Sequence, residues 1–264
     1  MNIKKHIPNF LTCCNLLCGI AGIYYAWLFN HDLTYASFFI YLACLFDFSD
    51  GFAARALKVS SPIGKELDSL ADMVTFGVLP GFMMALMLGL PTLNYMANVP
   101  EETIYFMRAM NSQDSFWLET ASKLAPFAFL ITVCSALRLA KFNIDTRQSD
   151  QFIGVPTPAN ALFISALPFL AKGQTEIGSI FTHPLALLIM VPVLSYLLVA
   201  ELPLIALKFK NYGWEDNKMR YILIISALLL VLTLKFVAIP IIIILYIILS
   251  IIENKLSRGK KPID

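Results

Sequence analysis

The sequence predicts an all-α membrane protein, a polytopic helical bundle of about eight transmembrane helices. Hydrophobic residues make up 58% of the 264 residues and charged residues only 14%, whereas soluble domains average about 25% charged residues. The mean hydropathy is +0.71. Several apolar runs approach or exceed the roughly 20 residues that a helix needs to cross a bilayer. No polar stretch is longer than about 30 residues, so no separate soluble domain is expected.

A series of apolar runs defines the predicted helices in chain order. They cover residues 8–29, 33–57, 64–89, 119–141, 156–172, 183–206, 219–237 and 239–254. The first run follows a basic N-terminus, but it is longer than the apolar core of a signal peptide and continues into bulky residues, so we interpret it as a span. The second run should end at Ser60-Ser61-Pro62, where the chain turns back into the third.

The later runs are delimited by polar segments and prolines. The fourth follows residues 90–118, which we interpret as a solvated connection at the membrane interface, with a functional lid as the alternative. The two prolines of "GVPTPAN" suit the start of the fifth run. The last long run is divided near Lys235–Pro240, because proline breaks or kinks a helix. We therefore expect a membrane core in residues 1–206, and two additional spans with a basic tail in residues 207–264.

The distribution of cations predicts the orientation of these spans. Of the 20 lysine and arginine residues, all but Arg108, Lys123, Lys172 and Lys235 fall on one side of the predicted bundle. Basic residues concentrate on the cytoplasmic side of membrane proteins. Both termini are therefore predicted to be cytoplasmic, in a multi-pass protein of the cytoplasmic (inner) membrane.

Four aspartates cluster where the second and third spans meet. Asp47 and Asp50 are three residues apart and share a helical face, and Asp68 and Asp72 are four apart on the next helix. Two antiparallel helix ends would aim both pairs at one point, where unneutralised carboxylates repel one another. Oxygen-only ligands favour Mg²⁺, Mn²⁺ or Ca²⁺. Because intramembrane acids are costly and usually functional, we predict a metal site rather than charged helix caps.

Small residues and one arginine accompany the acids. Gly64 lies on the same helical face as Asp68 and Asp72, and Gly51 directly follows the first acidic pair. Glycine lets a backbone or a bulky ligand approach closely. Arg55 is one turn beyond Gly51, where it could neutralise a phosphate. Acids, metal ions, open space and a guanidinium together predict a phosphoryl-transfer site at a membrane surface.

The same residues carry a resemblance to a known family. Residues 47–72 read D-x2-D-G-x2-A-R-x8-G-x3-D-x3-D, which resembles the signature of the CDP-alcohol phosphatidyltransferases, and the resemblance covers nearly all of residues 8–206. It implies a six-span helical core open to the cytoplasm, and a two-metal site built by Asp47, Asp50, Asp68 and Asp72, with Asp72 as the general base. It also implies CDP contacts with Pro8, Asn9, Thr12, Asn15, Gly51, Ala54, Arg55 and Gly64.

Two later segments resemble the phosphatidylserine synthase branch of that family. They are "SALRLAKFN" and "FIGVPTPANA", both predicted at the membrane level of the acids. A zwitterionic amino acid needs a cation for its carboxylate, which Arg138 could supply, although positive-inside topology alone would also explain this arginine. Asn143, or backbone near Gly154 and Pro156, could accept from the ammonium.

The expectation is an enzyme that transfers a phosphatidyl group from CDP-diacylglycerol to L-serine with two divalent ions as cofactors. Glycerol 3-phosphate, an inositol phosphate and choline are the alternative acceptors. A cation transporter is the alternative from another class. The expected partners are CDP-diacylglycerol, L-serine and membrane lipids, without nucleic acid, and a homodimer is compatible with the sequence.

Overall fold

The structure of the protein is a computed structural model, and helices account for nearly all of it. It describes residues 6–29, 32–59, 61–96, 112–145, 152–172, 176–205 and 213–258. Within these residues, five helical segments are long and apolar enough to cross a membrane: Ile7–Leu28, Thr34–Leu57, Pro62–Gly89, Ala125–Ile144 and Asn217–Lys255. A shorter apolar helix covers Pro184–Val199. The predicted all-α polytopic membrane fold is confirmed. Most of the predicted connection at 90–118 and the end of the basic tail lie outside the described residues.

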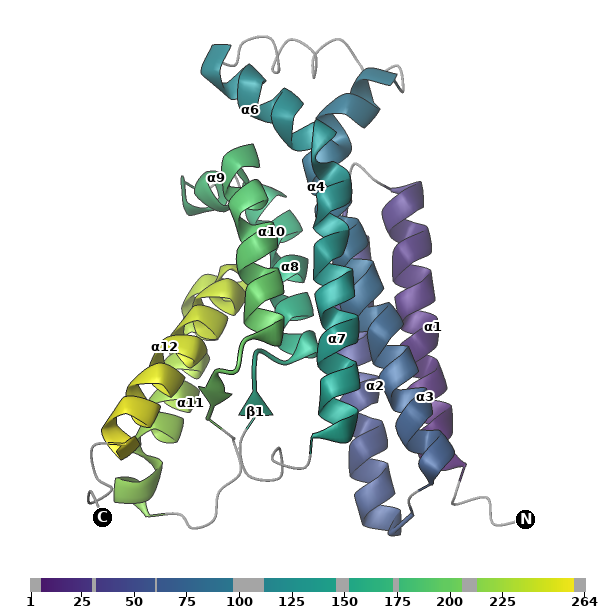
Figure 1. Cartoon of the computed structure of the whole chain (residues 1–264), viewed down its shortest axis with the longest axis vertical. Coiled ribbons are helices and arrows are strands. Elements are labelled where there is room, and N and C mark those ends of the chain that lie inside the picture. Colours follow the sequence, from purple (N-terminus) through teal and green to yellow (C-terminus); the bar gives the residue numbers. More distant parts are fainter. Residues whose placement is uncertain are drawn as a thin grey trace.

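The first three helices form one side of the molecule. α1 (Ile7–Leu28) packs along α2 (Thr34–Leu57), and α3 (Pro62–Asp72) returns beside α1 (Figure 1). α2 ends at Lys58, which adopts a left-handed conformation with φ 52°. Ser61 then caps α3, because its Oγ accepts the N–H of Gly64 at 3.0 Å. The chain therefore reverses where the sequence predicts, and brings two acidic helix ends together.

The helix that contains Asp72 changes its winding directly after that residue. α3 continues without a break through a π-helical segment, Met73–Val78, into α4 (Leu79–Met96). Thr132 Oγ1 donates to the Gly77 carbonyl at 3.0 Å, and Thr75 Oγ1 donates to the Asn15 carbonyl at 3.1 Å. Such π-helical turns are rare and occur frequently at functional sites.

The apolar core includes buried side chains of α1 and α2 and continues across the molecule to α10 (Pro184–Val199). α4 packs with α7 (Leu130–Ile144), α8 (Thr157–Lys172) and α10 around fully buried side chains such as Phe76, Met83 and Ile164. α6 (Ser112–Lys123) and α9 (Glu176–Thr182) lie at the upper end in Figure 1. A 3₁₀ turn, Ala125–Phe129, separates α6 from α7, so the predicted fourth span is not one continuous helix.

A short β-pair replaces the end of the predicted sixth span. α10 ends at Val199 rather than near residue 206, and Ala200 is already extended. In a continued helix, the ring of Pro203 would clash with the carbonyl four residues earlier, that of Val199, which accounts for the early end. β2 (Pro203–Leu204) pairs antiparallel with β1 (Phe152–Ile153), the segment that leads into α8.

The last two helices form a hairpin beside this core. α11 (Trp214–Leu234) and α12 (Ala238–Arg258) pack on each other and are joined by a 3₁₀ turn, Lys235–Val237, where the sequence predicts the division. α12 also packs against α8. In Figure 1, α1 begins and both α2 and α12 end toward the lower end of the molecule.

Candidate active site

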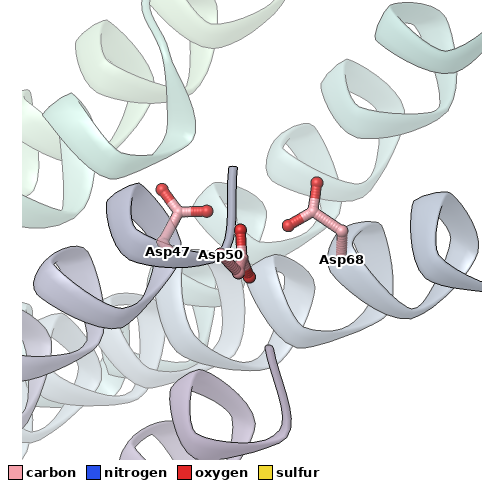
Figure 2. A group of neighbouring side chains, drawn as sticks. All are labelled: Asp47, Asp50 and Asp68. Carbon is pink, nitrogen blue, oxygen red and sulfur yellow. The ribbon is translucent and has the colours of Figure 1, made fainter. Parts of the chain in front are cut away.

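Three of the four aspartates converge at one point. Asp47 and Asp50 project from α2 and Asp68 from α3 (Figure 2). One carboxylate oxygen from each of the three lies within 4.8 Å of the others. Asp72 lies next to this group, since its carboxyl is within hydrogen-bonding reach of Asp47. The helical spacing of the two pairs and the reversal of the chain at Ser61 are together sufficient to build this cluster.

The polar residues of α1 face the acids. Thr12 Oγ1 donates to Asp50 Oδ2 at 2.6 Å, and Asn15 Nδ2 donates to Asp72 Oδ1 at 3.1 Å. Both Thr12 and Asn15 are buried. Thr12 and Asn15, both implied by the family resemblance as CDP contacts, therefore each donate a hydrogen bond to one of the four carboxyl groups.

The cluster fits a site for divalent cations. Asp50 is only 6% exposed, and Asp68 Oδ1 and Asn15 Oδ1 are buried without a hydrogen-bond partner among the described residues. Several carboxylates that face one another in a membrane protein are unfavourable unless positive charge neutralises them. All the converging ligands are oxygen atoms, which suits Mg²⁺, Mn²⁺ or Ca²⁺. The residues present therefore fit the predicted metal ions.

A cavity of about 280 Å³ opens beside the acids, between α1, α2 and α3. Its lining includes Pro8, Asn9, Thr12, Asp50, Gly51, Ala54, Gly64 and Asp68, and also Val59, Ser61 and Lys65. Six of the eight residues predicted to contact CDP thus share one cavity wall. Arg55 is exposed on the surface beside Gly51, and Asn15 lies deeper, at Asp72.

Gly64 has a steric role in this wall. A Cβ atom at this position would lie 2.9 Å from Asn9 Oδ1 and 3.0 Å from Ser61 Oγ. Any larger residue would therefore displace the capping hydroxyl or the Asn9 amide. Glycine is needed here because α1 and the start of α3 approach closely.

Arg138 lies on α7 and is not part of the cavity between α1, α2 and α3. It is 7% exposed, and its Nε has no hydrogen-bond partner among the described residues. Its guanidinium is close enough to Asp72 for an electrostatic interaction, and its Cζ lies 5.9 Å from the ring centroid of Phe142. A buried guanidinium without a bonded carboxylate is unfavourable, so an anionic ligand would stabilise this site.

Further polar side chains on α7, α8 and α10 are buried, and some of their atoms have no hydrogen-bond partner among the described residues. These atoms include Ser135 Oγ, Thr157 Oγ1, both amide atoms of Asn160, and Ser195 Oγ. Buried polar groups normally find partners. Ser135 lies one turn before Arg138 on α7, and Thr157 and Asn160 lie in the first turn of α8, so a polar ligand between these two helices would supply the missing partners. Sequence reasoning missed these residues, although an amide inside an apolar helix was a usable signal for Asn160.

The helix register places Asn160 at the depth of the acids. Tyr41 Oη on α2 donates to the Ser165 carbonyl on α8 at 3.3 Å, and these two helices run in opposite directions (Figure 1). Asp47 is six residues after Tyr41, and Asn160 is five residues before Ser165. At about 1.5 Å per residue, both lie roughly 8–9 Å from that contact toward the same end.

The other residues predicted to bind serine have contacts of their own. Asn143 Nδ2 donates to Ser69 Oγ at 2.9 Å, and the Asn143 carbonyl accepts from Lys65 Nζ at 3.0 Å. Gly154 has a φ of +74°, and its N–H donates to the Leu202 carbonyl at 2.9 Å. Pro156 follows this turn and is half-buried. Asn143 thus joins α7 to α3, whereas Gly154 and Pro156 lead into α8.

Comparison with known proteins supports the same chemistry. Residues 5–199 match the sequence model of a family described as CDP-alcohol phosphatidyltransferase. A CDP-diacylglycerol–serine O-phosphatidyltransferase of Bacillus subtilis is 32% identical over 75% of this chain and 89% of its own length. One of Helicobacter pylori is 29% identical over 93% and 90%. An archaetidylserine synthase of Methanothermobacter thermautotrophicus is 28% identical over 74% and 73%.

Proposed function

Because the chain belongs to the CDP-alcohol phosphatidyltransferase family, we propose that it transfers the phosphatidyl group of CDP-diacylglycerol to L-serine. The products are phosphatidylserine and CMP. The observation that carries the choice of acceptor is Arg138, a buried cation beside Asp72 with an unpartnered Nε. The names of the relatives in Bacillus subtilis and Helicobacter pylori support serine as well.

CDP-diacylglycerol binds with its nucleotide in the cavity between α1, α2 and α3. Asn9 and Thr12 offer hydrogen-bonding groups there, and Lys65 adds a cation at the wall. The diphosphate then lies at Asp50 and Asp68, which line the inner end of the same cavity. The acyl chains extend between helices on the lipid side.

Asp72 takes the proton of the serine hydroxyl. Its carboxyl is held by the Asn15 amide at 3.1 Å, which orients it as a general base. As the proton leaves, the serine oxygen forms a bond to the β-phosphorus, and the bond from that phosphorus to the CMP oxygen breaks. The bonding electron pair leaves with CMP.

The four aspartates hold the metal ions. Asp47, Asp50 and Asp68 provide converging oxygens within 4.8 Å, and Asp72 lies at their edge. Two divalent ions, when bound, would supply the positive charge that neutralises the diphosphate and stabilises the leaving CMP.

Serine binds on the Arg138 side of the acids. Its carboxylate pairs with the guanidinium. The oxygens of Thr157 and Asn160, which are buried and have no partner within the part of the chain that the structure describes, accept from the ammonium. Asn143, Gly154 and Pro156 remain predicted contacts on this side. The serine hydroxyl can then point toward Asp72, because Arg138 and Asp72 interact electrostatically in the structure.

Replacing Arg138 tests the acceptor. Arg138→Ala should lower kcat/KM for serine by roughly 10- to 150-fold, since a charge-assisted hydrogen bond contributes about 1.5–3 kcal/mol. Most of the change should appear in the KM for serine, with little change in the KM for CDP-diacylglycerol. Arg138→Lys should recover only part of the loss, because lysine keeps the charge but not the bidentate fork.

Lys123→Ala is the matched control for loss of a cation, since Lys123 is exposed and pairs with Glu119 on α6. Steady-state assays with each substrate varied measure all three variants. Unchanged serine kinetics in Arg138→Ala would contradict the assigned role. If the wild type does not use serine but does use glycerol 3-phosphate, an inositol phosphate or choline, the proposed acceptor is wrong. The proposed transfer of a phosphatidyl group from CDP-diacylglycerol would still hold.

The active site opens to the cytoplasm in this proposal, with the lower end of Figure 1 on that side of the inner membrane. Single cysteines placed at Lys58 and Lys255, in a cysteine-free background, should be labelled only from the cytoplasm. A cysteine at Lys123 should be labelled only from the opposite side. All three positions are exposed. Labelling of Lys58 and Lys123 from the same side would contradict the orientation.

A further inference from the structure

We propose that the C-terminal hairpin, α11 and α12 (Trp214–Arg258), positions the serine side of the active site. The family match ends at residue 199, before this hairpin begins, so its role does not follow from family membership. The inference rests on the proposed function for the identity of the acceptor. It names three positioning residues on α12: Tyr246, Ser250 and Asn254.

These three side chains hold β2 and Ile205, the residue that follows it. Tyr246 Oη donates to the Ile205 carbonyl at 3.0 Å, and Ser250 Oγ accepts the Ile205 N–H at 3.1 Å. Asn254 Nδ2 donates to the Pro203 carbonyl. The residues are four apart and therefore form one stripe along α12. Because Ser250 and Ile205 are buried, the stripe fixes a backbone segment that water cannot satisfy.

β2 in turn holds the segment that begins α8. Ile153 pairs with Pro203 in the antiparallel β1–β2 ladder. The Gly154 N–H donates to the Leu202 carbonyl at 2.9 Å, and the Val155 N–H donates to the Leu197 carbonyl at 3.0 Å. Gly154 has no room for a side chain, since a Cβ would lie 2.9 Å from the Leu198 carbonyl oxygen. The turn is thus locked in place immediately before Thr157.

Thr157 and Asn160 therefore depend on α12 through this backbone. Both lie in the first turn of α8, directly after the locked segment, and both are buried with unpartnered polar atoms. Arg138 is connected in the same way: it lines a cavity of about 30 Å³ with Ile153 of β1 and Val199, Ala200 and Glu201 before β2.

Tyr246 of the hairpin also lies near Arg138. The phenol of Tyr246 and the guanidinium of Arg138 are close enough to interact electrostatically. At its other end the hairpin is anchored by Phe236, whose ring stacks on Phe169 of α8 with centroids 4.0 Å apart. The hairpin is thus fastened at both ends, and its stripe faces the acceptor side rather than the CDP cavity.

The test separates positioning from folding. Truncation after residue 206 would remove a membrane hairpin and could prevent folding, so point variants are used. Tyr246→Phe, Ser250→Ala and Asn254→Ala each remove one hydrogen bond to the segment Pro203–Ile205. Each should raise the KM for serine by about 2- to 10-fold, the effect of one hydrogen bond. The kcat and the KM for CDP-diacylglycerol should stay within about 2-fold.

Two further variants sharpen the result. Ser250→Thr retains the hydroxyl and should restore the KM for serine toward the wild-type value. Thr233→Val is the matched control, because the Thr233 hydroxyl of α11 bonds carbonyls of its own helix, those of Leu229 and Leu230. It should leave all three parameters unchanged.

Either of two results would overturn the inference. The first is an unchanged KM for serine in all three α12 variants. The second is a fall in kcat accompanied by an equal rise in the KM values for serine and for CDP-diacylglycerol. If the wild type does not use serine, the proposed function fails. The KM for the alcohol that it does use then decides the role of the hairpin by the same criterion.

Discussion

Replacing Asp72 with asparagine is expected to lower kcat by more than about 100-fold while both substrates still bind. The substitution preserves size, and its amide oxygen can still accept the Asn15 hydrogen bond that Asp72 Oδ1 accepts at 3.1 Å. What it removes is the group that takes the proton from serine. The loss should therefore appear in kcat, with the two KM values much less affected.

Asp32→Asn is the matched control for this substitution. Asp32 lies near the start of α2, away from the acids, and pairs with Lys172 Nζ at 2.7 Å. Although partial burial opposes ionisation, the hydrogen bonds from Lys172 and Thr34 keep the pKa of Asp32 below its ordinary value. Asp32→Asn should retain wild-type kcat. A wild-type kcat in Asp72→Asn would exclude Asp72 as the general base.

Chelation of divalent metal should abolish the reaction, and added Mg²⁺ or Mn²⁺ should restore it. The carboxylates of Asp47, Asp50 and Asp68 converge within 4.8 Å, and the unpartnered Oδ1 of Asp68 needs positive charge. Asp68→Ala should raise the metal concentration for half-maximal activity by about 10-fold or more, because it removes a ligand. Titration of chelated enzyme with each metal measures this value.

Glu66→Ala provides the comparison on the same helix. Glu66 is two residues before Asp68 but exposed, so its loss should leave the metal requirement unchanged. An equal shift in both variants would indicate general surface charge rather than ligation. Full activity after exhaustive chelation would contradict the metal site.

Most of the acidic site could be predicted because its information is local in the sequence. The spacing of Asp47 with Asp50, and of Asp68 with Asp72, follows the helical period, and Pro62 reverses the chain between them. Thr12 shares this property, since it lies on a regular polar strip of α1 and reaches Asp50 at 2.6 Å. Elements of this kind need only helix geometry and one turn.

The acceptor side could be predicted only in part. Ser135, Thr157 and Asn160 belong to two helices, and each is a single polar residue in an apolar run. Whether these residues could bind a ligand depends on the helix packing, which buries their polar atoms without partners among the described residues. The β1–β2 pair that follows the early end of α10 is likewise non-local, because its partners Phe152 and Leu204 are 52 residues apart in the sequence.

The π-helical segment Met73–Val78 has an evolutionary consequence. Each residue of a helix turns the chain by about 100°, so one additional residue in a turn rotates everything after it relative to everything before it. Asp68 and Asp72 can thereby face α1 and α2, while Leu79 and Met83 are fully buried in the core. The additional residue of the π-helical turn thus sets the direction of the acidic face of α3 relative to the buried face of α4. Core positions after residue 78 can then change by drift and repacking without altering the direction of the acids, whereas a deletion within the segment would turn the acids away in a single step.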